Sequence, residues 1–313
     1  MMERVFRTLE ETINKSAITL FRNFVNKYPD VTKWFMCSDY CFDDKSKANN
    51  VISFVIYPYI FDFNDWNSVI ETMQKTDLKH CRQVSPVFCD FTKKGYFFSF
   101  NFILDENCII EKWKDKTTLD KGIDDYIAMT EKWQQTTPKN AANYRRMNKK
   151  LHDLRNQTKR KNFNYKLLGR IMEVSFLAGY LKYLLYREAK DIEIFSWLSD
   201  RDAITSWNDG IYSDLYHMVS HCIISEKLSP EKDNSVKELM INDVNENMFY
   251  DPLNRVADFI CGGIADFNYI DGSVSGKKQQ TLIEDVISDN DYLIILKISE
   301  KGIARASHKK ICE

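Results

Sequence analysis

The chain has little proline or glycine and no long hydrophobic run. It holds 6 prolines and 10 glycines in 313 residues, which excludes collagen-like and proline-rich low-complexity proteins. The most apolar long stretch, residues 171–186, is interrupted by Glu173 and Lys182 and is too short to cross a bilayer. The N-terminal residues carry charge where a signal peptide needs an apolar core. We therefore expect a cytoplasmic protein with no membrane partner.

Several sequence motifs of known chemistry are also missing. The eight cysteines form no Cys-x-x-Cys pair, which argues against a disulfide scaffold or a zinc ribbon. No glycine-rich nucleotide loop or Gly-x-Ser-x-Gly elbow occurs. His217 and His221 have a spacing that can bind zinc, but Met218 stands where a zinc protease has Glu. We interpret these histidines as ordinary, partly buried residues.

What the sequence does contain is enough apolar surface for a core. Hydrophobic residues make up 44% of the chain and charged residues 28%, as in folded proteins. The length suits one large domain or two modest ones. We predict an N-terminal helix over residues 1–30, a single α/β domain over residues 31–298 with a helical insertion at residues 119–165, and a C-terminal tail over residues 299–313.

Hydrophobic periodicity predicts the order of the elements. Residues 33–39 and 51–60 are typical of a hairpin, and residues 84–91 and 96–104 of a second one. Further strands are expected at residues 192–198 and 292–298, and helices at residues 3–28, 64–75, 166–189, 206–225 and 252–267. Antiparallel strands followed by long helices and more strands indicate a mixed α/β domain.

Positive charge is concentrated in one segment of a chain whose net charge is −1. Between Pro138 and Arg170 there are eleven lysines and arginines and one acid. Apolar residues recur there at helical spacing, so the cations are expected on one face of a helix, which can neutralise phosphates and bind nucleic acid. A solvated face, or a contact with acidic parts of the same chain, is the alternative. The candidate nucleic-acid-binding residues are Arg145, Arg146, Lys149, Lys150, Arg155, Lys159, Arg160 and Lys161.

Four places in the sequence supply carboxylates suited to a metal. Asp39 continues the apolar row of the first predicted strand, and Glu173 lies beside the apolar stripe of the long helix at residues 166–189. Asp200 and Asp202 follow the predicted strand at residues 192–198. The last is Asp258, one helical turn before Gly262, whose missing side chain would let another element approach closely.

Carboxylates that converge from two strands and a helix are what paired Mg²⁺ or Mn²⁺ ions need for phosphoryl transfer. We predict Asp39, Asp202 and Asp258 as metal ligands, with Glu173 and Asp200 assisting them. Each residue also has a simpler interpretation. Asp200 or Asp202 would cap the next helix, Glu173 would be a partly exposed helix residue, and Asp258 would pair with Arg255.

This set of residues resembles the ribonuclease-H-like superfamily. The segment from Leu253 to Gly263 is similar to an Ala-Asp helix of uncharacterised bacterial proteins of that fold, and the resemblance covers roughly residues 30–270. It implies a mixed sheet with antiparallel N-terminal strands and flanking helices, into which the basic helical segment is inserted. It places Asp39 at the first-strand metal position, Glu173 at the helix position, Asp200 or Asp202 at the second strand, and Asp258 last.

The resemblance implies a Mg²⁺- or Mn²⁺-dependent nuclease or phosphodiester-transfer protein that acts on nucleic acid. The sequence departs from the family at Tyr40, because an acidic residue usually follows the first Asp. A non-catalytic scaffold that binds nucleic acid or protein on the same fold is therefore the second interpretation.

Overall fold

The computed structural model describes residues 2–110, 115–239 and 248–306, and the chain forms two compact units. The sheet unit comprises Met1–Ile109, Leu185–Asp200 and Asn234–Glu313. The helical unit comprises Ile110–Leu184 and Arg201–Asp233, and so contains the predicted insertion at residues 119–165. Within the described ranges, no helix combines the length and apolarity that crossing a membrane requires.

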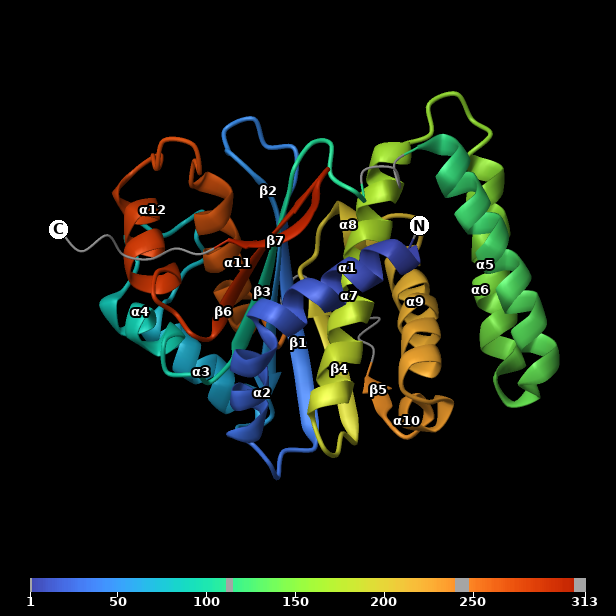
Figure 1. Ribbon diagram of the computed structural model, residues 1–313, viewed down its shortest axis with the longest axis horizontal. Coiled ribbons are helices and arrows are strands. Elements are labelled where there is room, and N and C mark those ends of the chain that lie inside the picture. The colour runs from blue at the N-terminus through green and yellow to red at the C-terminus, as the bar shows by residue number, and fades with distance from the viewer. Residues whose placement is uncertain (1, 111–114, 240–247, 307–313) are drawn as a thin grey trace. The chain divides into compact units, whose positions relative to one another are not determined.

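A seven-stranded mixed sheet forms the centre of the sheet unit (Figure 1), with the strand order β5-β4-β1-β2-β3-β6-β7. The pairs β1–β2, β2–β3 and β6–β7 are antiparallel, while β1–β4, β4–β5 and β3–β6 are parallel. The prediction of a mixed α/β sheet that opens with antiparallel strands is therefore confirmed. The strands are β1 (Lys33–Cys41), β2 (Asn50–Pro58), β3 (Phe98–Leu104), β4 (Ile194–Ser199), β5 (Lys237–Leu239), β6 (Leu293–Ser299) and β7 (Gly302–Ala306).

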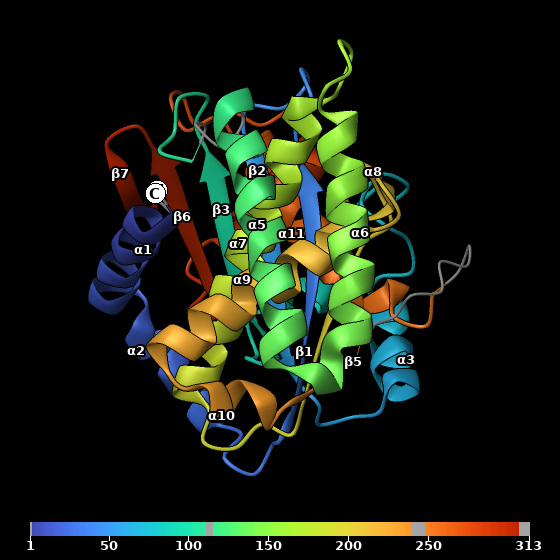
Figure 2. The ribbon, with the colours of Figure 1, turned by 90° about the vertical axis from the view of Figure 1, so that its right-hand side faces the viewer.

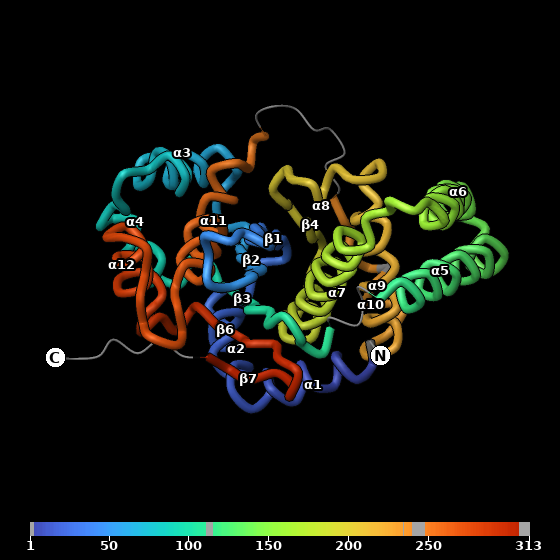
Figure 3. The backbone as a smooth tube through the Cα atoms, turned by 90° about the horizontal axis from the view of Figure 1, so that it is seen from above, coloured from blue at the N-terminus to red at the C-terminus, as the bar shows by residue number. Residues whose placement is uncertain are grey.

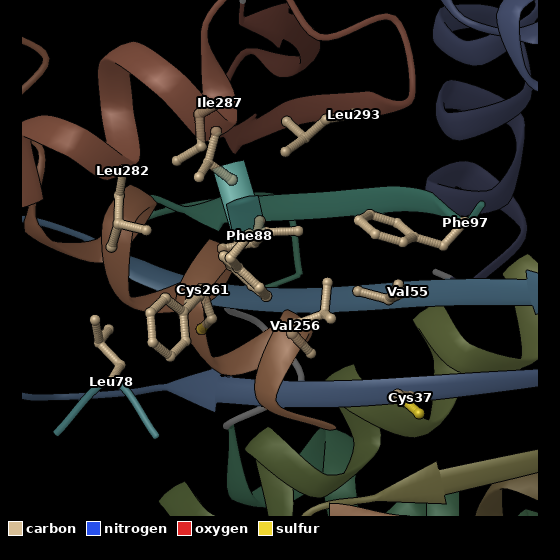
Figure 4. Packing of buried hydrophobic residues seen from close by; sticks show 14 of the residues in the cluster. Cys37, Val55, Leu78, Phe88, Phe97, Val256, Cys261, Leu282, Ile287 and Leu293 are labelled. Carbon is tan, nitrogen blue, oxygen red and sulfur yellow. The ribbon is translucent and has the colours of Figure 1, made fainter. Parts of the chain in front are cut away.

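Helices cover both faces of this sheet (Figure 1) because its strands alternate two apolar rows. On one face, the rings of Phe21 and Phe24 pack against that of Phe98, edge-on and tilted respectively. On the other face, a buried cluster joins alternate residues of β1 and β2 to helices that follow them in the chain (Figure 4). The helices and helical segments of the sheet unit are α1 (Met2–Ser16), α2 (Ile18–Asn26), α3 (Phe63–Met73), α4 (Pro86–Thr92), α11 (Asp251–Asp266), α12 (Lys277–Thr281) and η3 (Leu282–Ile287).

Three predictions about elements need correction. Residues 84–91 do not form a hairpin strand, since Pro86 opens the helix α4 and Phe88 and Phe91 enter the core three residues apart. The helix expected over residues 3–28 is two helices, with a break at Ala17. The expected C-terminal tail contains β7, which pairs with β6.

The helical unit consists of α-helices and one short 3-10 turn. Its helix α6 buries Met147, Leu151 and Leu154 on one side, as the spacing of these residues predicts. Asn148 donates hydrogen bonds to the α5 carbonyl of Ile127, so α5 and α6 pack side by side (Figure 2). The helices are α5 (Lys116–Thr136), η2 (Pro138–Asn140), α6 (Ala141–Gln157), α7 (Tyr165–Glu188, in this unit to residue 184), α8 (Ala203–Ser206), α9 (Ile211–Lys227) and α10 (Pro230–Asn234).

Candidate carboxylate site

Asp39 and Asp200 lie at the ends of two neighbouring parallel strands. The register of β1 and β4 pairs Ser38 with Ser199, and the Asp200 amide donates a hydrogen bond of 3.3 Å to the carbonyl of Ser38. Carried one residue further, this register sets Asp39 beside Asp200. Because parallel strands in register present paired residues on the same face, both carboxylates belong to one side of the sheet.

That side is the one covered by α11. Two residues before Asp39, Cys37 belongs to the buried cluster, and so does Leu198, two residues before Asp200. The cluster also contains most of the apolar residues of α11, and this helix lies along β1 and β2 (Figure 3). Both carboxylates therefore continue buried rows under α11 but are themselves only half-buried, at the point where the strands reach solvent.

α11 carries a third carboxylate, Asp258, whose charge acts on Asp39. Pro252 in the first turn favours the start of this helix. One turn after Asp258, the Cys261 thiol donates to the carbonyl of Val51 at 3.9 Å and also acts on Asp39, lowering the pKa of that carboxylate. Figure 4 shows Cys261 in the buried cluster, close to Phe88 of α4. Asp258 itself is half-buried, and its Oδ2 accepts a hydrogen bond of 2.7 Å from the Leu78 amide.

The three carboxylates act on one another electrostatically. Burial raises the pKa of Asp39 well above its usual range, and the charges of Asp258 and Asp200 raise it further. Burial also raises the pKa of Asp258 to about 6, with further contributions from Asp77 and Asp200, while the Leu78 amide and Arg255 oppose the rise. Raised pKa values from burial and like charges in one place are typical of functional sites.

The loop that carries Leu78, residues 74–78, is held against α11 by hydrogen bonds from Arg255 and by close packing at Gly262. Arg255 donates from Nη1 to the Gln74 carbonyl at 2.7 Å and from Nε to Asp77 at 3.0 Å. A side chain at Gly262 would overlap that of Leu78. The prediction that Gly262 permits a close approach is thus confirmed, and the alternative pairing of Arg255 with Asp258 is replaced by a pair with Asp77.

Asp202 and Glu173 belong to the helical unit and have other partners there. Asp202 is the N-cap of α8 and accepts hydrogen bonds from the amides of Ile204 and Thr205. Of the two predicted interpretations of Asp202, the structure thus supplies the cap. Glu173 is fully buried and not partly exposed, and it forms an ion pair of 2.9 Å with Arg170.

Part of the basic segment is neutralised within the helical unit. Arg146 and Lys150 both contact the buried carboxylate of Asp214. Arg155 bonds Asp124 at 2.7 Å and Asp120 at 3.3 Å. The predicted alternative, contact with acidic parts of the same chain, therefore holds for these three cations.

The remaining candidate nucleic-acid-binding cations face solvent, whereas Arg170 at the end of the segment is buried against Glu173. Arg145, Lys149, Arg160 and Lys161 are exposed, and in the described parts of the chain no carboxylate lies within ion-pair distance of them. Lys159 is also exposed and donates to the side chain of Asn156. These five residues are available to a negatively charged partner.

The helix with two histidines has a structural explanation. The carboxylate of Asp214 is taken by Arg146, and His221 Nδ1 lies 2.7 Å from Asp233. Over the described residues as a whole, no three His, Cys, Asp or Glu side chains are grouped as a ready-made metal site.

Sequence reasoning missed two residues that act on the carboxylates. Asp77 lies in a loop without any motif, and Cys261 looks like one more apolar residue of α11. The signal for Cys261 was its place three residues after Asp258, which sets both side chains on one helix face. Asn254, four residues before Asp258, is also buried.

The chain matches no protein-family model, and comparisons with curated proteins and with solved structures also find no match.

Proposed function

We propose that the sheet unit is a Mg²⁺- or Mn²⁺-dependent nuclease or phosphodiester-transfer domain of ribonuclease-H-like architecture. The observation that carries this proposal is that Asp39 and Asp200 stand side by side where the paired strands β1 and β4 end, and that the charge of Asp258 on α11 acts on Asp39. Asp200 takes the position for which the sequence offered Asp200 or Asp202, because Asp202 caps α8.

The architecture supports the same proposal. β1 and β2 form the antiparallel opening of the sheet, and β4 runs parallel to β1 and ends directly before Asp200. Asp258 lies in the middle of the Ala-Asp helix α11. These are the elements on which the resemblance places the metal ligands. Glu173, paired with Arg170, is outside the site that we propose.

The donor set fits a hard divalent cation. Burial and neighbouring acids raise the pKa values of Asp39 and Asp258, and a bound cation would favour the charged form of both carboxylates. Mg²⁺ keeps several waters and is usually bound through one or two carboxylates together with substrate phosphates, so it does not require a closed cage of protein ligands. A bound cation would supply Lewis acidity and activate water for attack on phosphorus.

The chain's own residues position the carboxylates. The Leu78 amide donates a hydrogen bond to Asp258 and orients it, and Cys261 lowers the pKa of Asp39. Both interactions favour the ionised carboxylates that a cation needs. Asp200 follows the last residue of β4 and is directed by the pairing of β4 with β1.

The test is a nuclease assay of the full chain with single- and double-stranded DNA and RNA. We expect cleavage in Mg²⁺ or Mn²⁺ and none in EDTA. Asp258→Asn should lower the rate at least about a hundredfold, because it removes charge from the metal site. Asp191→Asn, which changes an exposed carboxylate of the same unit, should cleave like the wild type. Metal-dependent cleavage that survives in Asp258→Asn would contradict the assignment.

A non-catalytic nucleic-acid-binding scaffold is the second candidate. It is favoured by the exposed cations Arg145, Lys149, Arg160 and Lys161, which have no carboxylate partner among the described residues. Salt-dependent polynucleotide binding without cleavage under any divalent metal would select this function over the first.

A further inference from the structure

We infer that the side-chain amide of Asn254 supplies a further oxygen ligand to the cation of the carboxylate site. The inference rests on the function proposed above and extends it by one residue. It starts from the side-chain amide of Asn254, which has no hydrogen-bond partner among the described residues.

Asn254 is buried with neither of its polar atoms satisfied. Its side chain belongs to a residue that is 6% exposed, and in the described parts of the chain neither Oδ1 nor Nδ2 has a hydrogen-bond partner. Buried amides are nearly always hydrogen-bonded, because losing water without a replacement is costly. An orphaned amide of this kind indicates that a ligand, ion or water completes its coordination.

The helix sets Asn254 on the face that carries the site. With 3.6 residues per turn, Asn254, Asp258 and Cys261 fall within an arc of about 60°. Cys261 reaches Asp39 on β1 from this face. One turn earlier, the Tyr250 hydroxyl donates to the carbonyl of Ser199, the residue before Asp200. Asn254 therefore lies between two contacts that α11 makes with the ends of β1 and β4.

An amide oxygen suits this position better than a fourth carboxylate. Mg²⁺ and Mn²⁺ take neutral oxygen ligands such as Asn carbonyls alongside carboxylates. The charges of Asp39, Asp200 and Asp258 already oppose one another. A neutral donor adds coordination without adding repulsion, and its burial keeps it in place before the cation arrives.

The experiment compares metal affinity with the stability of the metal-free protein. Mn²⁺ binding to the full chain is measured by electron paramagnetic resonance, and thermal unfolding is followed in EDTA. Asn254→Leu, similar in volume and without polar atoms, should weaken Mn²⁺ binding about tenfold or more. Its melting temperature in EDTA should equal or exceed that of the wild type, since an unsatisfied buried group has been removed. Asn254→Asp keeps an oxygen and should still bind Mn²⁺.

Asn290→Leu is the matched control. Asn290 is 8% exposed, and its amide donates to the carbonyls of Thr92 and Val286. We expect this variant to lose stability and to keep wild-type Mn²⁺ affinity.

The outcomes separate this inference from the proposed function. If Asn254→Leu is less stable but binds Mn²⁺ as tightly as the wild type, the inference is overturned and Asn254 is a structural or water-binding residue. The proposed function would stand in that case, provided that Asp258→Asn abolishes Mn²⁺ binding. A wild-type chain that binds no Mn²⁺ would remove the metal site itself. Asn254→Asp also serves as a control for misfolding. If both Asn254 variants lose Mn²⁺ binding although Asn254→Asp unfolds normally, Asn254 does not act through a side-chain oxygen.

Discussion

Asp258 shows how one side chain combines a structural and a chemical role. Its carboxylate accepts the Leu78 amide and so holds a loop on α11, while burial and neighbouring acids keep its pKa at about 6. A purely structural anchor needs no charge, since Asn could accept the same hydrogen bond. The raised pKa is consistent with the cation-binding role that we propose for this carboxylate.

This pKa predicts how the stability of the metal-free protein varies with pH. Folding raises the pKa of Asp258 from 3.8 to about 6, so its protonated form is favoured in the native state. The contribution of Asp258 to the free energy of unfolding is complete below about pH 3.8. It is lost as the pH rises through about 6, and the loss amounts to at most about 3 kcal/mol. We expect chemical denaturation in EDTA to show a free energy of unfolding that falls from pH 4.5 to pH 7.5.

Asp258→Asn should make that pH profile less steep, with the remaining slope due to Asp39, whose pKa is also raised. It should be more stable than the wild type at pH 7.5, because the amide accepts from Leu78 without carrying charge. Asp191→Asn should retain the wild-type slope. Addition of Mn²⁺ should restore stability to the wild type at pH 7.5, since a ligand that binds the folded state stabilises it. Identical slopes for the wild type and Asp258→Asn would show that another group is responsible.

At the scale of elements, the position of α11 depends both on the side chains it carries and on the missing side chain at Gly262. Gly262 leaves room for Leu78, and the loop from Gln74 to Leu78 is held by Arg255 and Asp258. The apolar residues on the other turns of α11 bury the helix against β1 and β2. The position of Asp258 over the strand ends thus depends on a small residue one turn away.

Two Gly→Ala substitutions should therefore have opposite effects. Gly262→Ala would push the Leu78 side chain away and should destabilise the protein by about 1–3 kcal/mol, as overpacking does. Its Mn²⁺ affinity should also fall, because the Leu78 amide moves away from Asp258. Gly122→Ala in α5 meets open space and should stabilise the protein by about 0.5–1 kcal/mol through helix propensity.

Denaturation curves of the two variants, with Mn²⁺ titrations alongside, check this pair. A Gly262→Ala protein as stable as Gly122→Ala would mean that Leu78 moves aside at no cost and that Gly262 has no part in placing the loop.

At the scale of the whole molecule, charge is divided between the two units. The sheet unit carries the acidic site, while the helical unit carries the exposed cations of α6 and the loop after it. Three of the basic residues of α6 are used internally, on Asp214 and on Asp120 and Asp124. Only the solvent-facing remainder can release counterions from a polynucleotide.

Charge reversal should distinguish these two groups of cations. Replacing Arg145, Lys149, Arg160 and Lys161 by Glu should leave folding intact and weaken polynucleotide binding, with the salt slope reduced by about 0.9 for each cation that contacts a phosphate. Fluorescence anisotropy at several salt concentrations measures this slope. Reversing Arg146 and Lys150 should instead destabilise the protein, since it leaves Asp214 buried beside new acids.

A variant that reverses Lys33, Lys45, Lys75 and Lys190, four exposed residues of the sheet unit, changes the net charge by the same amount and serves as the control. If it weakens binding as much as reversal in the helical unit does, the basic segment has no special role.

Much of this protein follows from local patterns along the chain. The β-branched and aromatic runs at residues 33–39 and 51–60, and the helical spacing in α7 and α11, predict these elements correctly because each element is largely buried along its length. The prediction of a strand at residues 84–91 is wrong because a short apolar run fits a strand or a helix equally well. The helix forms because it lets both Phe88 and Phe91 pack into the core.

The carboxylate site depends on contacts between distant parts of the chain. Alternation treats Asp200 and Asp202 as equivalent, yet the hydrogen bonds of β4 with β1 set Asp200 at the strand end, while Asp202 turns to the amides of α8. The partners of Asp258 come from a loop about 180 residues away. Local spacing carries no information about such pairings, because packing over the whole sheet unit determines which side chains share a buried, charged environment.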